Sequence, residues 1–296
     1  MPKFGVSIYS ISRKIISGEI TPVEGVKILS DFGAQTIELV PFGFDMIKDP
    51  SLIDKFLKVS DETKVPIENY SLNANFLLIS DEEYKAEVSR VKQHIDVADK
   101  LSIPTIRVDC AGFRRPIHEN TIENFQKELP LIIDTYENLC EYANKYNITV
   151  LIENHGFHAN GAERVRQILT SVKAKNFSHQ LDTGNYVCVD DCAVAAVKKV
   201  MEFATTIHMK DFYIRTNDPG DATQFDCSGS WFRSVSGKYL RGSIMGQGDL
   251  DIPTIMGLIK QPGFDGNIYI EFEGMEDCLY GTKVSLDNMI RIYDSV

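Results

Sequence analysis

The stretch VSIYSISRK, residues 6–14, covers the end of the first predicted β-strand and the turn that follows it. In an open, doubly wound α/β sheet, this junction usually carries a glycine-rich turn that binds a phosphate group. Residues 6–14 contain no glycine. The stretch therefore favours a closed barrel over an open sheet, because the rest of the chain repeats the same alternation of strands and helices.

Seven further runs rich in β-branched residues follow, and nearly all are separated by a segment with helical periodicity. These runs begin near residues 35, 65, 103, 148, 177, 205 and 266. Thr21 and Pro22 mark the start of a predicted helix, and longer helices are predicted at 81–101 and 121–146. Repeated units of this kind imply parallel strands joined by helical crossovers.

Eight such units in 296 residues predict an α/β fold of one domain over residues 1–296, a (β/α)8 TIM barrel. A long irregular loop is predicted at about 213–250, just before the last strand. A loop of this length in a compact domain often covers a site or contacts a partner. We therefore expect it to close over the mouth of the barrel.

Composition narrows the class of protein. The formal net charge of −11 argues against a nucleic-acid partner, since such proteins usually present a basic face. Hydrophobic residues make up 43% of the chain, yet no apolar run approaches the roughly 20 residues that a membrane span needs. Six cysteines without a CxxC pair, and an N-terminus without a signal-peptide pattern, indicate a reduced, cytoplasmic compartment. The composition is compatible with a homo-oligomer and does not decide the oligomeric state.

Four consecutive predicted strands end in a residue that can bind a metal ion: Glu153, Asp182, His208 and Glu271. The C-terminal ends of the strands meet at one mouth of a (β/α)8 barrel, where the active sites of this fold lie. Three carboxylates and one imidazole form a mostly hard ligand set, which suits Mn²⁺, Mg²⁺ or Co²⁺, with Zn²⁺ as a further option. Each residue also has a structural interpretation, because Asp opens turns and His fills cores. Glu273, on the same side of its strand as Glu271, is an alternative ligand.

Other polar residues near the strand ends are candidates for contacts with a substrate. Glu38 ends the second predicted strand, whereas His155 and Lys210 follow two of the ligand positions. Arg241, in the long loop, offers a fork of donors to an anionic group. Residues expected to be structural are His94, His118, His179 and the pair formed by Arg107 and Asp109.

Several segments resemble the xylose isomerase-like TIM-barrel superfamily of sugar isomerases and epimerases. The segments are LIENHG (151–156), LDTGN (181–185), IHMKDF (207–212), RGSIMGQGDLD (241–251) and PGFDGNIYIEFEG (262–274). The resemblance implies one divalent metal ion, Mn²⁺ first, held by Glu153, Asp182, His208 and Glu271. It implies a sugar, sugar phosphate or polyol ketone as substrate, with proton abstraction next to the carbonyl and a metal-stabilised cis-enediolate. In related epimerases, the glutamates that match Glu153 and Glu271 are also the acid/base pair.

The chain departs from the ketose 3-epimerases of this superfamily at two positions. Asn185 stands where they carry a histidine, and Ala159 stands where they carry a second glutamate. Asn185 is therefore a candidate substrate contact, and 3-epimerisation itself is not implied. The main alternative is a lyase similar to inosose dehydratase, which would use the same metal site. An endonuclease IV-like repair nuclease fits less well, because the net charge is −11 and the expected histidines are missing. A barrel that binds sugar without turnover is the remaining alternative.

Overall fold

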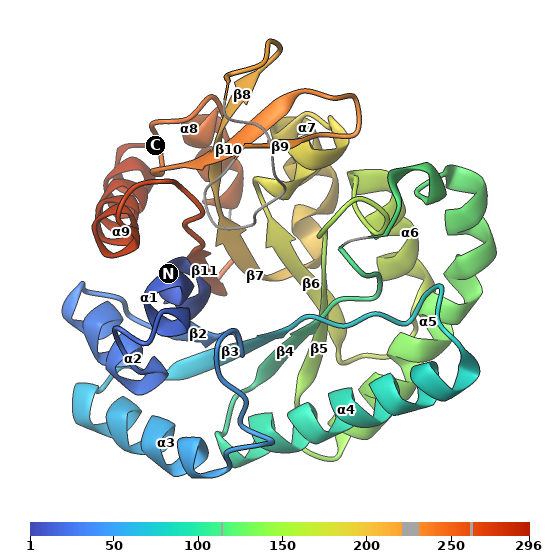
Figure 1. Ribbon diagram of the computed structural model, residues 1–296, viewed down its shortest axis with the longest axis horizontal. Helices are drawn as coiled ribbons and strands as arrows, with labels where there is room; N and C mark the ends of the chain where they lie inside the picture. The colour runs from blue at the N-terminus through green and yellow to red at the C-terminus, as the bar shows by residue number, and fades with distance from the viewer. Residues whose placement is uncertain (114, 221–230, 261–262) are drawn as a thin grey trace.

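Eight parallel strands close into a barrel in the order β1-β11-β7-β6-β5-β4-β3-β2, surrounded by helices (Figure 1). This computed structural model describes residues 1–113, 115–220, 231–260 and 263–296. The barrel strands are β1 (Lys3–Ser7), β2 (Ile37–Leu39), β3 (Ile67–Leu72), β4 (Thr105–Val108), β5 (Thr149–Glu153), β6 (Phe177–Asp182), β7 (Ala204–Met209) and β11 (Asn267–Ile270). The predicted (β/α)8 fold is confirmed.

Helices cover the outside of the barrel between successive strands. The α-helices are α1 (Ser12–Ile16), α2 (Pro22–Asp31), α3 (Ser51–Thr63), α4 (Asp81–Lys100), α5 (Ile122–Asn144), α6 (Ala162–Ser171), α7 (Ala193–Val200), α8 (Ile252–Ile259) and α9 (Cys278–Ser295). Short 3₁₀ turns are η1 (Ile8–Ile11), η2 (Ile117–Glu119), η3 (Asn185–Val189) and η4 (Met201–Phe203). None of the helices in the described part of the chain is long and apolar enough to cross a membrane.

The helix starts follow local rules that the sequence already carries. Thr21 accepts a hydrogen bond from the backbone N–H of Glu24, and the Glu24 carboxylate accepts one from the N–H of Thr21 at 2.7 Å. This capping box pairs backbone donors that a helix start otherwise leaves without partners, and the following Pro22 has the backbone angle that the first turn needs. Ser80 and Glu83 form the same arrangement at the start of α4. The predicted boundaries of α2 and α4 are therefore nearly those observed.

The main core lies between the barrel and its helices, where apolar side chains such as Val150, Ile207 and Leu286 are fully buried. The barrel interior is different, because buried polar side chains project into it. Asn69, Gln180 and Thr206 are examples, and Gln180 Oε1 lies within hydrogen-bond distance of both of the others. A polar interior below the mouth can hold charged groups above it in fixed positions.

The segment predicted as an irregular loop at about 213–250 contains a three-stranded sheet, so that part of the prediction is wrong. β8 (Asp211–Arg215) pairs antiparallel with β10 (Tyr239–Ser243), which also pairs with β9 (Phe232–Arg233). Alternation along these short strands buries Phe212 and Leu240 in a second apolar cluster, which propensity alone did not reveal. The middle of the segment, 221–230, lies outside the described residues.

Candidate metal centre

The four predicted ligands meet at the C-terminal mouth of the barrel. One ligand atom from each of Glu153, Asp182, His208 and Glu271 lies within 4.8 Å of the others, and all four residues are buried. Glu153 and Asp182 end β5 and β6, His208 lies in β7, and Glu271 directly follows β11. Because neighbouring parallel strands are held in register, with Asp182 opposite His208, the strand ends bring these side chains together.

Asp182 opens the turn with one carboxylate oxygen and presents the other to the cluster. Its Oδ1 accepts hydrogen bonds of 2.8 Å from the backbone N–H groups of Gly184 and Asn185, which fixes the turn. Its Oδ2 is buried and accepts no hydrogen bond, although Lys210 Nζ lies 3.1 Å away as an ion-pair partner. Burial raises the pKa of Asp182 to about 6, against the opposing effect of Lys210. The Oδ2 atom therefore remains available to a cation.

His208 directs one ring nitrogen at the cluster and the other at Glu38. Its Nδ1 lies 3.4 Å from Glu271 Oε2 and 3.5 Å from Glu153 Oε1. Its Nε2 lies 2.9 and 2.8 Å from the two oxygens of Glu38. The Gln180 amide nitrogen also lies 2.9 Å from Nε2, but two carboxylate oxygens at this distance favour a proton on Nε2. That tautomer leaves the Nδ1 lone pair for a metal ion.

Glu38 is fully buried and belongs to the support of His208. It accepts hydrogen bonds from Asn69 at 2.6 Å and from Ser71 at 2.8 Å. It is not among the residues that line the cavity at the mouth. The interpretation of Glu38 as a substrate contact is therefore not supported. Sequence reasoning located the residue at a strand end but could not show that its partner would be a ring 170 positions away.

An arginine holds Glu153 on the side away from His208. Arg107 Nε lies 2.8 Å from Glu153 Oε2, while Arg107 Nη1 lies 2.8 Å from Asp109 Oδ1, so the predicted Arg107–Asp109 pair is confirmed. His155 Nδ1 lies 3.0 Å from the other oxygen of Asp109. Asn185 Nδ2 donates to Glu153 Oε1 at 3.2 Å. Burial opposes ionisation of Glu153, but Arg107 and His208 together hold its pKa well below the usual range.

Lys210 occupies the opposite wall and contacts three carboxylates. Its Nζ lies 2.5 Å from Glu271, 3.1 Å from Asp182 and 3.5 Å from Glu273. Glu271 belongs to the ligand cluster and Glu273 does not, so the cluster favours Glu271 as the ligand. Burial raises the pKa of Glu273 to about 7, with Lys210 opposing. The backbone at Gly184 packs closely against the Lys210 side chain, since a Cβ at Gly184 would lie 2.7 Å from Lys210 Cβ.

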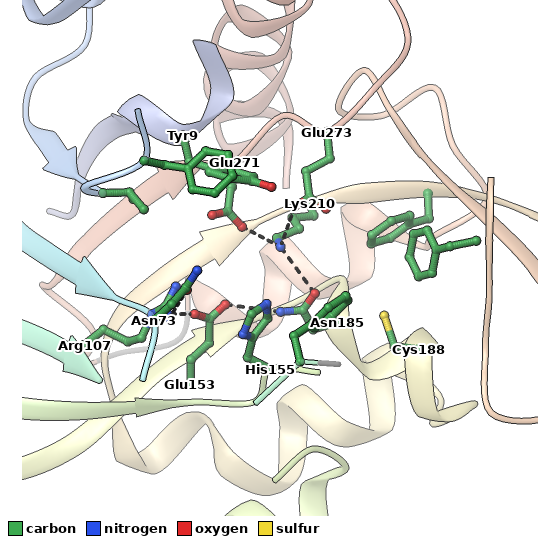
Figure 2. Close-up of a pocket in the computed structure, with 15 residues that line it drawn as sticks. Tyr9, Asn73, Arg107, Glu153, His155, Asn185, Cys188, Lys210, Glu271 and Glu273 are labelled. Atoms are coloured by element: carbon green, nitrogen blue, oxygen red, sulfur yellow. Dashed lines mark hydrogen bonds and ion pairs between the residues drawn. The ribbon is translucent and has the colours of Figure 1, made fainter. Parts of the chain in front are cut away.

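A cavity of about 250 Å³ opens directly on this cluster (Figure 2). Its polar lining includes Glu153, His155, Asn185, Lys210, Glu271 and Glu273, with Tyr9, Asn73 and Arg107. Its apolar lining is Val40, Phe42, Phe113, Cys188, Phe212 and Phe232. Sequence reasoning missed Tyr9 and Asn73 as well as the aromatic side chains, because nothing in their local sequence distinguishes them from core residues. Phe232, in β9 of the long segment, is among these residues, so part of that segment does reach the mouth.

The remaining predicted residues lie away from this cavity. The Arg241 guanidinium lies over the rings of Tyr213 and Trp231, 5.0 Å from each centroid, and does not line the cavity. A role for Arg241 in binding substrate is therefore not supported. His94 bonds to a buried tyrosine hydroxyl and His179 to a backbone carbonyl, as expected of structural histidines.

The donor set fits a divalent cation. Three carboxylates in a buried cluster repel one another strongly at a low effective dielectric, and a doubly charged cation removes that repulsion. The Asp182 Oδ2 atom, which accepts no hydrogen bond, and the orientation of His208 Nδ1 agree with this use. Carboxylate oxygens with one imidazole are the ligands that such ions take in proteins.

Comparisons with known proteins place this geometry in a family. A search among curated proteins found no match. Among solved structures, the IOLI protein with a binding zinc atom has a TM-score of 0.74 and 13% identity, covering 99% of this chain and 98% of that one. The probable 3-DHS dehydratase AsbF from Bacillus anthracis has a TM-score of 0.73 and 16% identity, covering 98% and 99%. The 3-keto-D-glucoside 4-epimerase YcjR from E. coli has a TM-score of 0.70 and 13% identity, covering 98% and 100%.

At these identities the solved structures establish the shared barrel rather than a shared reaction. The family model of the xylose isomerase-like TIM barrel, however, matches residues 26–291, which is most of the chain. The closed barrel of eight parallel strands agrees with that match. The chain belongs to the xylose isomerase-like TIM barrel family.

Proposed function

We propose that the protein is a divalent-metal-dependent isomerase or epimerase that acts on a sugar or polyol ketone. The observation that carries the proposal is the buried ligand cluster, which opens directly on a cavity large enough for a small polyol. Glu153, Asp182, Glu271 and His208 Nδ1 would hold the metal, with Mn²⁺ as the first ion to test. When bound, such an ion polarises the carbonyl of a substrate and makes the neighbouring C–H more acidic.

Glu153 and Glu271 are the proposed bases. They come from β5 and β11, which are separated by two strands in the barrel, so their carboxylates face the cavity from different walls. A proton removed by one carboxylate on one face can be replaced from the other face, which inverts a carbon centre, or at the neighbouring carbon, which isomerises. Arg107 and Lys210 hold these carboxylates in place, and Asn185 and Asn73 present amides to substrate hydroxyl groups.

A dehydratase is the second candidate function. Glu273 places a further carboxyl group in the cavity, beyond those of the metal cluster. A group in this position can protonate a hydroxyl group as it leaves from the carbon next to the one that lost its proton. The structural likeness to a probable 3-DHS dehydratase is compatible with this alternative.

The proposal is tested by solvent deuterium incorporation. Metal-loaded protein is incubated in D₂O with a panel of ketoses, aldoses, inososes and their phosphates, and carbon-bound deuterium is measured by NMR. Epimerisation or isomerisation predicts deuterium in product and in recovered substrate, whereas dehydration predicts an enone-type absorbance. No exchange into any member of the panel, with metal bound, contradicts both candidates and leaves a barrel that binds without turnover.

A further inference from the structure

Besides the contacts that Arg107 and Lys210 make with the metal cluster, each cation that lines the cavity is paired with a carboxylate outside the cluster. Arg107 Nη1 lies 2.8 Å from Asp109, and His155 Nδ1 lies 3.0 Å from the same carboxylate. Lys210 Nζ lies 3.5 Å from Glu273. These pairs do not involve the four residues of the metal cluster. They therefore stay available to the cations when the cluster's own carboxylates are occupied by a metal ion.

The rest of the described lining adds no further positively charged side chain. Val40, Phe42, Cys188 and Phe212 provide apolar surface, and the amides of Asn73 and Asn185 are neutral. Among the described residues that line the cavity, every lysine and arginine has a carboxylate partner within 4.0 Å. A phosphorylated or carboxylated ligand would have to displace one of these partners and then remain beside its negative charge.

We propose that this cavity selects uncharged ketoses or polyol ketones and rejects phosphorylated and carboxylated ones, with Glu273 as a specificity-determining residue. The substrate class rests on the proposed function, but the charge selection itself does not. Like charges placed next to one another at a binding site repel, which disfavours the wrong ligand. When a metal ion occupies Glu271 and Asp182, removing the charge of Glu273 leaves Lys210 without a carboxylate partner of its own at the cavity wall, and an anionic ligand can then take that place.

The first arm of the test compares ketoses with their phosphates at pH 8. The pairs are D-fructose with D-fructose 6-phosphate and D-ribulose with D-ribulose 5-phosphate, and the readout is kcat/KM for deuterium exchange. For any pair that exchanges, we expect the wild-type kcat/KM to be at least about tenfold higher for the uncharged sugar than for its phosphate. Glu273→Gln should lower this ratio of the two kcat/KM values by at least about tenfold. Glu62 is an exposed residue of α3. The control Glu62→Gln removes the same charge far from the cavity and should leave the ratio of kcat/KM values unchanged.

The second arm does not depend on turnover. Inorganic phosphate and D-fructose 6-phosphate are titrated calorimetrically into the metal-loaded wild type and both metal-loaded variants at pH 8. Glu273→Gln should bind them at least about tenfold more tightly than the wild type, and Glu62→Gln should match the wild type. If no sugar exchanges deuterium in the first arm, the proposed enzymatic function is contradicted. The calorimetric arm then tests the charge selection without the first arm. A wild type that prefers the phosphorylated members, or a Glu273→Gln protein with unchanged anion affinity, overturns the inference.

Discussion

Replacing Glu38 by Gln should weaken metal binding by switching the tautomer of His208. The oxygen of Gln will take the place of Glu38 Oε2, because that atom accepts hydrogen bonds from Asn69 at 2.6 Å and Ser71 at 2.8 Å. The amide nitrogen then takes the place of Oε1, 2.9 Å from His208 Nε2. The Gln oxygen at the Oε2 position still lies 2.8 Å from Nε2 and can accept its proton, but the amide donor at 2.9 Å replaces an acceptor and opposes a proton on Nε2. The tautomer equilibrium therefore shifts towards a proton on Nδ1, the atom that faces the cluster.

The magnitude follows from the role of such carboxylates. A partner that orients a metal-binding histidine is commonly worth about 10–100-fold in affinity, or about 1.4–2.7 kcal/mol. Calorimetric titration of Mn²⁺ at pH 8 gives the affinity, and ¹⁵N NMR of the metal-free ring identifies the protonated nitrogen. Glu68→Gln is the matched control, because Glu68 pairs with Lys3 near the other end of the barrel. An unchanged affinity, or a proton that stays on Nε2 in a folded Glu38→Gln protein, refutes this account of His208.

Three further predictions concern the bases, a buried histidine and a glycine. Glu153→Gln and Glu271→Gln should retain metal at saturating Mn²⁺ yet lose about 10²–10⁴-fold in the rate of deuterium exchange. Full exchange in both variants would show that another residue acts as the base. Burial lowers the pKa of His94 to about 4, against an ordinary value of 6.5, so the unfolded chain binds a proton first as the pH falls. The stability contributed by neutral His94 is complete above pH 6.5 and is lost between pH 6.5 and about 4, amounting to about 2 kcal/mol by pH 5. Urea unfolding at pH 7 and pH 5 should show this difference between wild type and His94→Gln, and equal pH dependence in the two proteins would contradict it. Gly184→Ala should disturb the cavity wall, because its Cβ would lie 2.7 Å from Lys210 Cβ and 2.9 Å from the Phe212 ring; we expect a loss of about 1–3 kcal/mol in stability, measured by thermal unfolding, and an unchanged unfolding midpoint would show that the wall can shift.

The barrel and its ligand cluster could be predicted from local sequence because each rests on a short-range pattern. Strands and helices alternate with clear starts, such as the capping box at Thr21, and the proposed metal ligands are the last residues of their strands or lie next to those ends. Once parallel closure is inferred, every strand end points to the same mouth, so residues such as Asp182 and Glu271 must converge. No knowledge of distant contacts is needed for this step.

The groups around the cluster were decided only by tertiary structure. Glu38 and His208 are 170 residues apart, and Arg107 reaches Glu153 from the neighbouring strand. Side chains of this kind look alike in sequence whether they touch substrate, hold a ligand or neutralise a charge, since the difference depends on which partner lies within hydrogen-bond distance. The small sheet formed by β8, β9 and β10 escaped prediction for the same reason. Its short strands gain stability by pairing with each other and by burying Phe212 and Leu240, contacts that exist only after the chain has folded.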